Sequence, residues 1–423
     1  MKKLFWIFIA SPVLFSARIW AQETVKDTVF LIPFADTVLL DEVVVKAHKT
    51  IPMNNRWSDL QPVDLVTVAG ANGNLYKALE TLPGTQIQGE SGRLLVRGGS
   101  SDETQTYIDG MHVLNPYTST AENTPARGRY SPFMFSGINL STGGHSQEYG
   151  EALSAVLPLE TKDNSRINKV GISPSTVGIG GGGNHAFRNA SLALNLDYQN
   201  LALYNKVYPG RIDFKKPYQM FSGATQFRYT PSGSSVFKIY VGYDRTDYSN
   251  YTDNNRYLFC LGENNVYLNS TFRTAISGGW EWFSGMAYSL FDRKVDGAVT
   301  EGDHWCEKQA ELHFKTKLSK KFHPTFRMDV GFESFLRWYE TRYSQVSVAD
   351  TKEISPTIEA VFGTVSYYPV ENLKAELSFR TEYASLARKI NFSPRLSLSY
   401  SWCDLVLSAT AGRYTQLPNA KYL

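Results

Sequence analysis

Few of the residues that could support catalysis or metal binding lie close together in the sequence. His145 and Glu148 have the spacing of two metal ligands, but they lie in a glycine-bracketed loop with no further ligand nearby, which favours a structural role. The run Gly180–Gly183 lacks the Gly-Lys-Ser/Thr sequence of a phosphate-binding loop, so we interpret it as a flexible turn. No Gly-x-Ser-x-Gly elbow occurs, and no carboxylate pair stands apart. We expect no catalytic, cofactor-binding or metal site, and the chain is not predicted to be an enzyme.

Three cysteines, Cys260, Cys306 and Cys403, are far apart in the sequence. Their odd number and wide spacing predict neither a zinc site nor a disulfide framework. Cys260 and Cys306 fall in two predicted loops. A disulfide between them, which an oxidising compartment would permit, and two free thiols are therefore both open alternatives.

A short β-prone segment precedes the first predicted domain. It consists of Asp41, Glu42, Val43, Val44, Val45, Lys46 and Ala47, and polar sequence surrounds it. Three consecutive valines favour an extended strand, yet no partner strand is near in the chain. We interpret this docking segment as a strand that pairs edge to edge with another protein.

The first residues have the order of a secretory signal peptide. Lys2 and Lys3 are followed by an apolar run over residues 4–15, and Ile19-Trp20-Ala21 offers a cleavage site after Ala21. The apolar run is shorter than the roughly 20 residues that span a bilayer as a helix. A membrane anchor is the disfavoured alternative, because polar sequence begins at Gln22. The mature chain is expected to be exported.

Composition then restricts the class of protein. The 423 residues include 25 Tyr, 24 Phe and 32 Gly, with a net charge of +3, and no later run approaches a transmembrane helix. An exported, aromatic-rich and nearly neutral chain is typical of a soluble β-protein or of an outer-membrane barrel. Neither the charge nor the motifs indicate binding of nucleic acid.

Residues 54–162 predict a small α/β domain. Asn72 or Asn74 can cap a helix whose apolar face includes Leu75 and Leu79, and Pro83-Gly84 ends it. Asp109-Gly110 lies between β-forming residues and favours a tight hairpin. Further short strands are predicted over residues 93–97, 138–142 and 152–161. Pro158 cannot donate a ladder hydrogen bond, so its strand is expected to be an edge or bulged strand.

From residue 163 onward apolar and polar residues alternate with a period of two. In residues 373–383, Leu373, Leu377 and Phe379 lie on one side and Lys374 and Arg380 on the other. About twelve such runs occur, each near the roughly ten residues of a tilted membrane strand. Their connections alternate between tight turns and long loops, as in an outer-membrane barrel, provided that a further strand lies around residues 167–183.

Five motifs in order resemble a TonB-dependent outer-membrane receptor. The sequence of the α/β domain is similar to the plug of this family, and the docking segment resembles the TonB box that precedes such plugs. The four plug motifs are Leu82-Pro83-Gly84, Leu95-Val96-Arg97-Gly98-Gly99, Tyr107-Ile108-Asp109-Gly110 and the segment from Gly144 to Gly150.

The resemblance implies a mainly β fold, with a small α/β plug domain followed by a transmembrane antiparallel β-barrel. We assign residues 1–21 to the signal peptide, 22–53 to the TonB box and linker, 54–162 to the plug and 163–423 to the barrel. Plugged transporters have 22 strands, so about twelve indicate an incomplete barrel. A fragment, a truncated gene product and a split receptor are the alternatives.

The resemblance also implies roles for individual residues. Arg97, Gly98, Gly99, Asp109 and Gly110 are expected to be structural in the plug. Arg97 and Asp109 either hold the plug against barrel charges or only satisfy local turns. Asp102, Glu103, Tyr117 and Arg127 lie in loops that correspond to the ligand-contacting loops of the family, and they are the ligand-binding candidates.

As a member of this family the protein would import a scarce ligand, of the siderophore, metal-chelate or cobalamin class, across the outer membrane of a Gram-negative cell. Its expected partners are TonB in the periplasm, outer-membrane lipid and the ligand, with a surface lipoprotein as an optional further partner. No cofactor is expected. The alternative is a non-transporting binding or signalling receptor, or a truncated remnant.

Overall fold

The computed structural model describes residues 57–60, 62–68, 70–71, 73–86, 92–119, 127–162, 168–209, 213–251, 258–298, 301–345, 348–402 and 405–419. The chain divides into two units, residues 1–48 and 49–423, and all described residues belong to the second. The predicted signal peptide and the docking segment Asp41–Ala47 lie outside the described residues.

The described plug region consists of a five-stranded sheet, a two-stranded sheet formed by β2 and β3, and two short α-helices. The strand order in the five-stranded sheet is β1-β6-β7-β4-β5. Asn74 caps the second helix by accepting a hydrogen bond from the Tyr76 amide, and the helix buries Leu75 and Leu79, as its sequence predicts. The elements are β1 (Trp57–Leu60), α1 (Pro62–Thr67), α2 (Leu75–Leu79), β2 (Thr85–Gln86), β3 (Leu95–Val96), η1 (Ser101–Glu103), β4 (Thr104–Ile108), β5 (Met111–Val113), η2 (Pro132–Met134), β6 (Phe135–Ser141) and β7 (Ala155–Thr161).

The strand of Pro158 was predicted to be an edge or a bulged strand, and it is not an edge strand. Its strand, β7, lies in the middle of the sheet, antiparallel to β6 and parallel to β4. The ladder to β6 shows no pairs between Ile138↔Leu159 and Ser141↔Val156, and a register shift lies nearby between Phe135 and Gly137. A proline is tolerated in this central strand because the ladder is interrupted where its missing N–H would donate.

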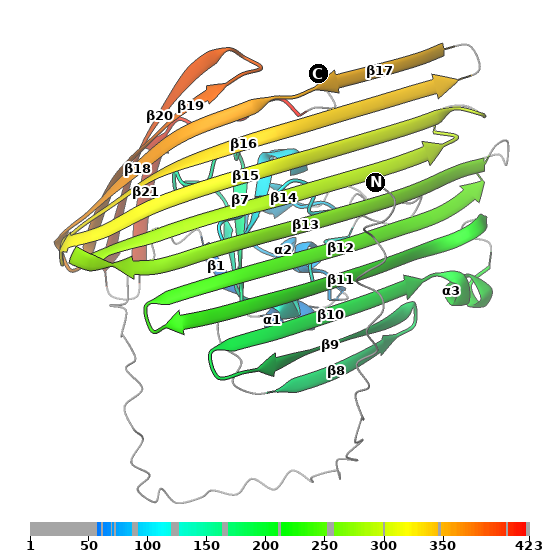
Figure 1. Cartoon of the computed structure of the whole chain (residues 1–423), viewed down its shortest axis with the longest axis horizontal. Coiled ribbons are helices and arrows are strands. Elements are labelled where there is room, and N and C mark those ends of the chain that lie inside the picture. Colours follow the sequence, from blue (N-terminus) through cyan, green and yellow to red (C-terminus); the bar gives the residue numbers. More distant parts are fainter. Residues whose placement is uncertain are drawn as a thin grey trace, which may run out of the picture. The chain divides into compact units, whose positions relative to one another are not determined.

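The remaining strands form a single antiparallel sheet of 14 strands, from β8 to β21 (Figure 1). They are β8 (Lys169–Ser175), β9 (Gly178–Ala186), β10 (Ala190–Asn200), β11 (Phe214–Ser232), β12 (Ser235–Tyr251), β13 (Leu258–Ile276), β14 (Trp280–Asp296), β15 (His304–His323), β16 (Phe326–Gln345), β17 (Val348–Ile354), β18 (Thr357–Val370), β19 (Leu373–Ala384), β20 (Lys389–Trp402) and β21 (Leu405–Gly412). From β8 to β21 the strands lie along the sheet in the order of the sequence, except for β17. β17 pairs only with β16, which also pairs with β18.

The sheet has two more strands than the dozen predicted, and many are longer than expected. The segment around residues 167–183 contains the hairpin β8–β9, so the expected hidden strand is present there as two. The run Gly180–Gly183 is therefore not a turn but part of β9, paired with β8 and β10. β15 and β16 have 20 residues each, about twice what a bilayer requires, because their pairing continues into the segments predicted as long loops.

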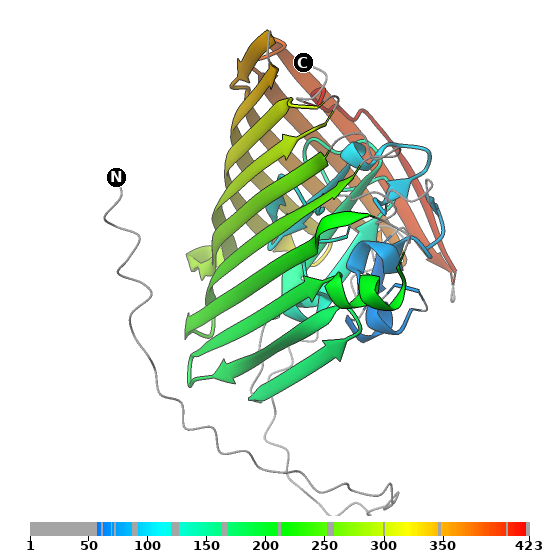
Figure 2. The same cartoon turned by 90° about the vertical axis from the view of Figure 1, so that its right-hand side faces the viewer.

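The polarity of the sheet is inverted relative to that of a soluble protein. In β19 the charged side chains are buried, with Arg380 2% and Glu382 4% exposed, while Leu377 is 61% and Phe379 41% exposed. The sheet curves around the plug region, so the polar face is turned toward the plug (Figure 2). This is the arrangement expected of a sheet whose outer face contacts lipid.

Connections between strands alternate as predicted. β11–β12, β13–β14 and β15–β16 are joined by two or three residues, whereas residues 201–213 and 297–303 join strands at the other rim. The longer connection between β10 and β11 includes helix α3 (Ala202–Val207). None of the described helices has the length and apolar character needed to cross a membrane.

Candidate functional site: the interface between plug and barrel strands

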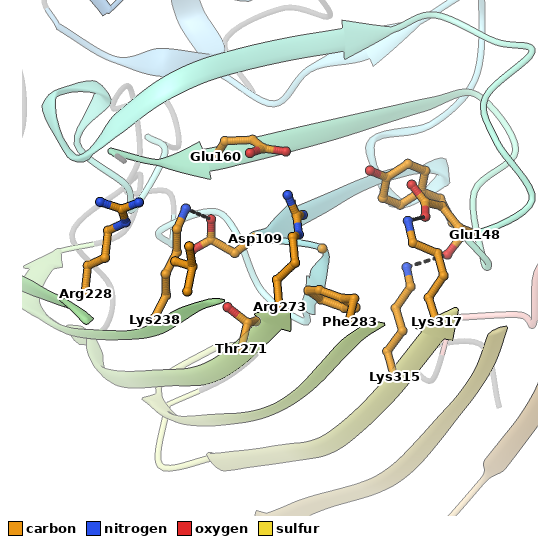
Figure 3. A pocket seen from close by; sticks show the side chains of 13 residues that line it. Asp109, Glu148, Glu160, Arg228, Lys238, Thr271, Arg273, Phe283, Lys315 and Lys317 are labelled. Atoms are coloured by element: carbon orange, nitrogen blue, oxygen red, sulfur yellow. Dashed lines mark hydrogen bonds and ion pairs between the residues drawn. The ribbon is translucent and has the colours of Figure 1, made fainter. Parts of the chain in front are cut away.

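Asp109 lies where the plug contacts the sheet. Asp109 has φ 50° and Gly110 φ 83°, the positive angles that a two-residue hairpin between β4 and β5 requires. The Asp109 carboxylate accepts hydrogen bonds from the amide and the hydroxyl of Thr161, at 3.1 and 2.6 Å. It also lies 3.2 Å from the Nζ of Lys238 on β12 (Figure 3). Asp109 therefore satisfies its local turn and also joins the plug to the sheet.

Arg97 does not contact the sheet in the same way. It is exposed with φ 52°, and among the described residues it forms no ion pair. Gly98 continues the turn at φ 78°. At Gly99 a Cβ atom would lie 1.7 Å from Ser154 Oγ, so only glycine fits. Arg97 thus belongs to a local turn only, whereas Asp109 also contacts the sheet.

The four ligand-binding candidates have different surroundings. Glu103 is part of a capping box with Ser100 and accepts a hydrogen bond from Ser154 Oγ at 3.0 Å, and Asp102 belongs to the same short helix η1. Tyr117 packs in the plug core at 4.5 Å from the Tyr76 ring. The Arg127 amide donates to Thr118 Oγ1 at 3.0 Å. Asp102 and Glu103 thus share one short helix, whereas Tyr117 belongs to the plug core.

A buried ion network that sequence reasoning missed joins Arg129 of the plug to the sheet. Arg129 is 4% exposed and pairs with Glu263 on β13. Glu263 also accepts from Arg293 Nε on β14 at 3.1 Å, and Ser119 of the plug donates to it. Breaking a buried pair by removing one partner typically costs about 3–5 kcal/mol, because the other charge is left uncompensated.

A second network alternates between plug and sheet. His112 Nδ1 of β5 lies 2.6 Å from Glu311 Oε1 on β15. The other oxygen of Glu311 accepts from Arg337 Nε at 2.7 Å, and Arg337 Nη1 donates to Glu151 of the plug at 2.9 Å. All four side chains are at least nine-tenths buried.

The loop from Gly144 to Gly150 is hydrogen-bonded to strands β15, β19 and β20 of the sheet. Arg395 Nη1 donates to the His145 carbonyl at 2.7 Å, and Gln147 Nε2 donates to the Ser393 carbonyl at 2.6 Å. At Gly150 a Cβ atom would lie 2.3 Å from Arg380 Nη2, so the buried guanidinium needs a glycine there. Arg380 itself pairs with Glu333 at 2.7 Å.

His145 and Glu148 do not converge on one point. His145 is buried beside the Tyr414 ring, and burial together with Arg395 lowers its pKa to about 3. Glu148 pairs with Lys317. In the described part of the chain, no three side chains of His, Cys, Asp or Glu are grouped so that they could hold a metal ion.

The two described cysteines lie in strands rather than in the predicted loops. Cys260 is in β13 and Cys306 in β15, with β14 between them, and both thiols are free. The strands extend further than predicted, so both residues are part of the ladder.

Comparisons with known proteins agree with this geometry. Residues 65–156 match the family model of the TonB-dependent receptor plug domain. No curated protein matches the chain. The siderophore receptor PirA from Pseudomonas aeruginosa aligns with a TM-score of 0.64 at 13% identity, over 87% of this chain and 63% of its own. The copper transporter OprC aligns with a TM-score of 0.67 at 12% identity, over 86% of this chain and 65% of its own.

PirA from Acinetobacter baumannii gives a TM-score of 0.66 at 13% identity, over 89% of this chain and 63% of its own. At such identities the likeness shows the fold alone, and the chain spans less than two thirds of each of these relatives. Residues 65–156 are thus a TonB-dependent receptor plug domain, and the fold of the chain, with a plug seated against barrel strands, is similar to that of the siderophore receptors and the copper transporter named above.

Proposed function

We propose that the protein acts as an outer-membrane importer in which the plug closes the passage and TonB opens it. The observation that carries the proposal is the seating of the plug by buried ion networks, such as Arg129–Glu263 and Arg337–Glu151, within the polar face of a sheet whose other face is apolar. A lipid-facing exterior and a plugged polar interior suit a gated passage better than a catalytic site.

The networks also suggest how the plug stays in place without energy input. Each network pairs a plug side chain with a barrel side chain, so moving the plug separates both partners at once. Because an unpaired buried charge is costly, the closed state is favoured until work is done on the plug. Water entering the passage would then solvate the separated charges.

For the energy input we propose TonB as partner and Asp41–Ala47 as its docking strand. Val43, Val44 and Val45 favour an extended conformation, and backbone hydrogen bonds would provide the grip. The signal peptide over residues 1–21, the linker to residue 53 and the plug over 54–162 complete the proposed organisation.

Val44→Pro tests the docking step. Proline removes one backbone donor and should abolish energy-dependent uptake by the complete receptor, while ligand binding to whole cells remains within about twofold of wild type. Val44→Ile is the matched control, because it keeps both the donor and the β-branched side chain. Uptake by the proline variant at the wild-type rate would exclude docking through this segment.

The proposed ligand class is a siderophore, another metal chelate or a cobalamin. Growth of a receptor-deficient strain that carries the complete receptor, under iron limitation and cobalamin limitation as separate conditions, distinguishes these classes. Rescue in one condition identifies the class. Binding of a ligand without uptake, even with Val44 intact, would instead support a non-transporting signalling receptor.

A further inference from the structure

A cationic chamber lies between the plug and the sheet. We define it by the five basic side chains that line it: Arg228, Lys238, Arg273, Lys315 and Lys317. The cavity has a volume of about 270 Å³, and the plug contributes Asp109, Glu148 and Glu160 to its lining (Figure 3). Five cationic groups face three carboxylates, so the lining has an excess of positive charge. Its size approaches that of small-molecule pockets, which begin at about 300 Å³.

The strand register explains why these cations meet. Arg228 on β11 is directly opposite Lys238 on β12, which is opposite Thr271 on β13. In the adjacent row, Arg273 on β13 is opposite Phe283 on β14, which is opposite Lys317 on β15. Side chains directly opposite each other lie on the same face of a sheet. Four strands therefore direct basic groups into one space.

The chamber lies toward the rim with the short turns. Arg228 is four residues before the end of β11, and Arg273 is three residues before the end of β13. Short turns form the periplasmic rim of outer-membrane barrels. In an importer, this end of the passage is the one that a ligand reaches last.

Two of the lysines pair with carboxylates of the plug. Lys238 Nζ is 3.2 Å from Asp109 Oδ1, and Lys317 pairs with Glu148. Lys315 Nζ donates to the Glu148 carbonyl oxygen at 2.7 Å. Displacement of these two plug segments would remove the carboxylates and leave the ammonium groups facing a partly enclosed space.

Arg273 provides a further unneutralised cation. Its guanidinium lies 5.8 Å from the centre of the Phe283 ring, and among the described residues no carboxylate lies within ion-pair distance of it. A cation without a carboxylate partner in a partly enclosed cavity favours an anion more strongly than one on an open surface. The chamber therefore attracts anions even before the plug moves.

We propose that the cationic chamber is a binding site for a small polycarboxylate, in which ligand carboxylates replace those of Asp109 and Glu148 as partners of the lysines. The class follows from the groups that are exchanged, because carboxylates occupy these positions in the closed state. The inference rests on the proposed import function and specifies that the imported ligand carries several carboxylates.

The test uses citrate as the probe, with the complete receptor in detergent at low salt and isothermal titration calorimetry as the measurement. Asp109→Asn and Glu148→Gln each remove one carboxylate partner of a chamber lysine and should tighten citrate binding by about three- to tenfold. Arg273→Gln and Lys317→Gln should weaken it by a similar factor. Asparagine preserves the turn, because Asn-Gly favours the same hairpin as Asp-Gly.

Lys321→Gln is the matched control, since Lys321 lies on the same strand as Lys317, is exposed, and is not part of the chamber. It should leave citrate affinity within twofold. Circular dichroism of each variant establishes that it is folded. Folded Asp109→Asn and Glu148→Gln variants that bind citrate no better than wild type would overturn the site, as would an equal loss in Lys321→Gln.

The two proposals fail separately. Binding is measured without TonB, so a tightened citrate affinity in a receptor that imports nothing would retain the chamber and overturn only the import function. Conversely, intact import together with an unchanged citrate affinity in all variants would overturn only the chamber.

Discussion

The plug and the sheet that surrounds it follow opposite rules of burial. In the plug, apolar side chains such as Leu75, Leu79 and Leu157 are completely buried and form an ordinary core. In the sheet, charged side chains such as Glu333 and Arg380 are buried and leucines are exposed. The inner side of the sheet is therefore largely polar, with a small apolar cluster that includes Tyr218 and Tyr248, and some of its charges pair with plug residues. Removing a buried charge from the inner face of the sheet is the most direct way to test the comparison.

Arg380→Ala should have the largest effect. It leaves Glu333 and Glu382 buried without their guanidinium partner and should lower the free energy of unfolding by about 3–5 kcal/mol. Urea unfolding of the complete receptor in lipid vesicles measures the change. Arg327→Ala is the control, because Arg327 is 46% exposed and its pair with Asp329, which is 18% exposed, should matter by less than about 1 kcal/mol.

Leu377→Arg tests the lipid-facing side of the same strand. Leu377 is 61% exposed, so in a soluble protein the substitution would cost almost nothing. On a lipid-facing surface it should destabilise the barrel by about 2–4 kcal/mol near the bilayer centre. Equilibrium folding into vesicles measures the cost, and a change below about 0.5 kcal/mol would contradict a lipid-facing outer surface.

Asn74→Ala tests the plug, which has an ordinary apolar core. Asn74 accepts hydrogen bonds from the amides of Tyr76 and Gly128, so its loss should destabilise the plug by about 1 kcal/mol. Hydrogen exchange of the α2 amides should rise while that of the barrel strands stays unchanged. Asn74→Asp, which keeps the cap acceptor, should remain close to wild type.

The smallest effect is expected from Glu148→Gln in acid. Although burial raises the pKa of Glu148, Lys317 and Lys315 outweigh it and lower the pKa to about 2. A lowered pKa in the folded state adds stability at neutral pH that is lost as the pH falls from about 4.5 toward 2. The glutamine variant should be slightly less stable at pH 7 and should lose less on acidification, as unfolding midpoints at the two pH values would show.

Local signals made much of the fold predictable. The cap at Asn74, the Asp109-Gly110 hairpin and the period-two alternation each act over a few residues, and the structure has the corresponding elements. The glycines of β9 were misinterpreted because glycine is typical of turns, whereas here they fit close neighbours: at Gly182 a Cβ atom would lie 2.6 Å from the Leu194 carbonyl oxygen.

The interface could not be predicted residue by residue. His112 and Glu311 are 199 positions apart, and no local pattern links them. The available signal was the row of charged residues on the polar side of each strand, such as Glu311, Glu333 and Arg337, which indicates that they face something polar but not which plug residue they meet. The central position of Pro158 was missed for the same reason, since strand order is set by contacts distant in sequence.

The position of β1 at one end of the plug sheet has a mechanical consequence. Its ladder to β6 comprises four residue pairs, and β1 has no second neighbour in the described part of the plug. Tension applied to the chain ahead of Trp57 would load this strand first. The ladders of the barrel are longer, with up to 19 pairs between β15 and β16, and would be strained much less. The plug can therefore deform under a force that leaves the barrel strands paired.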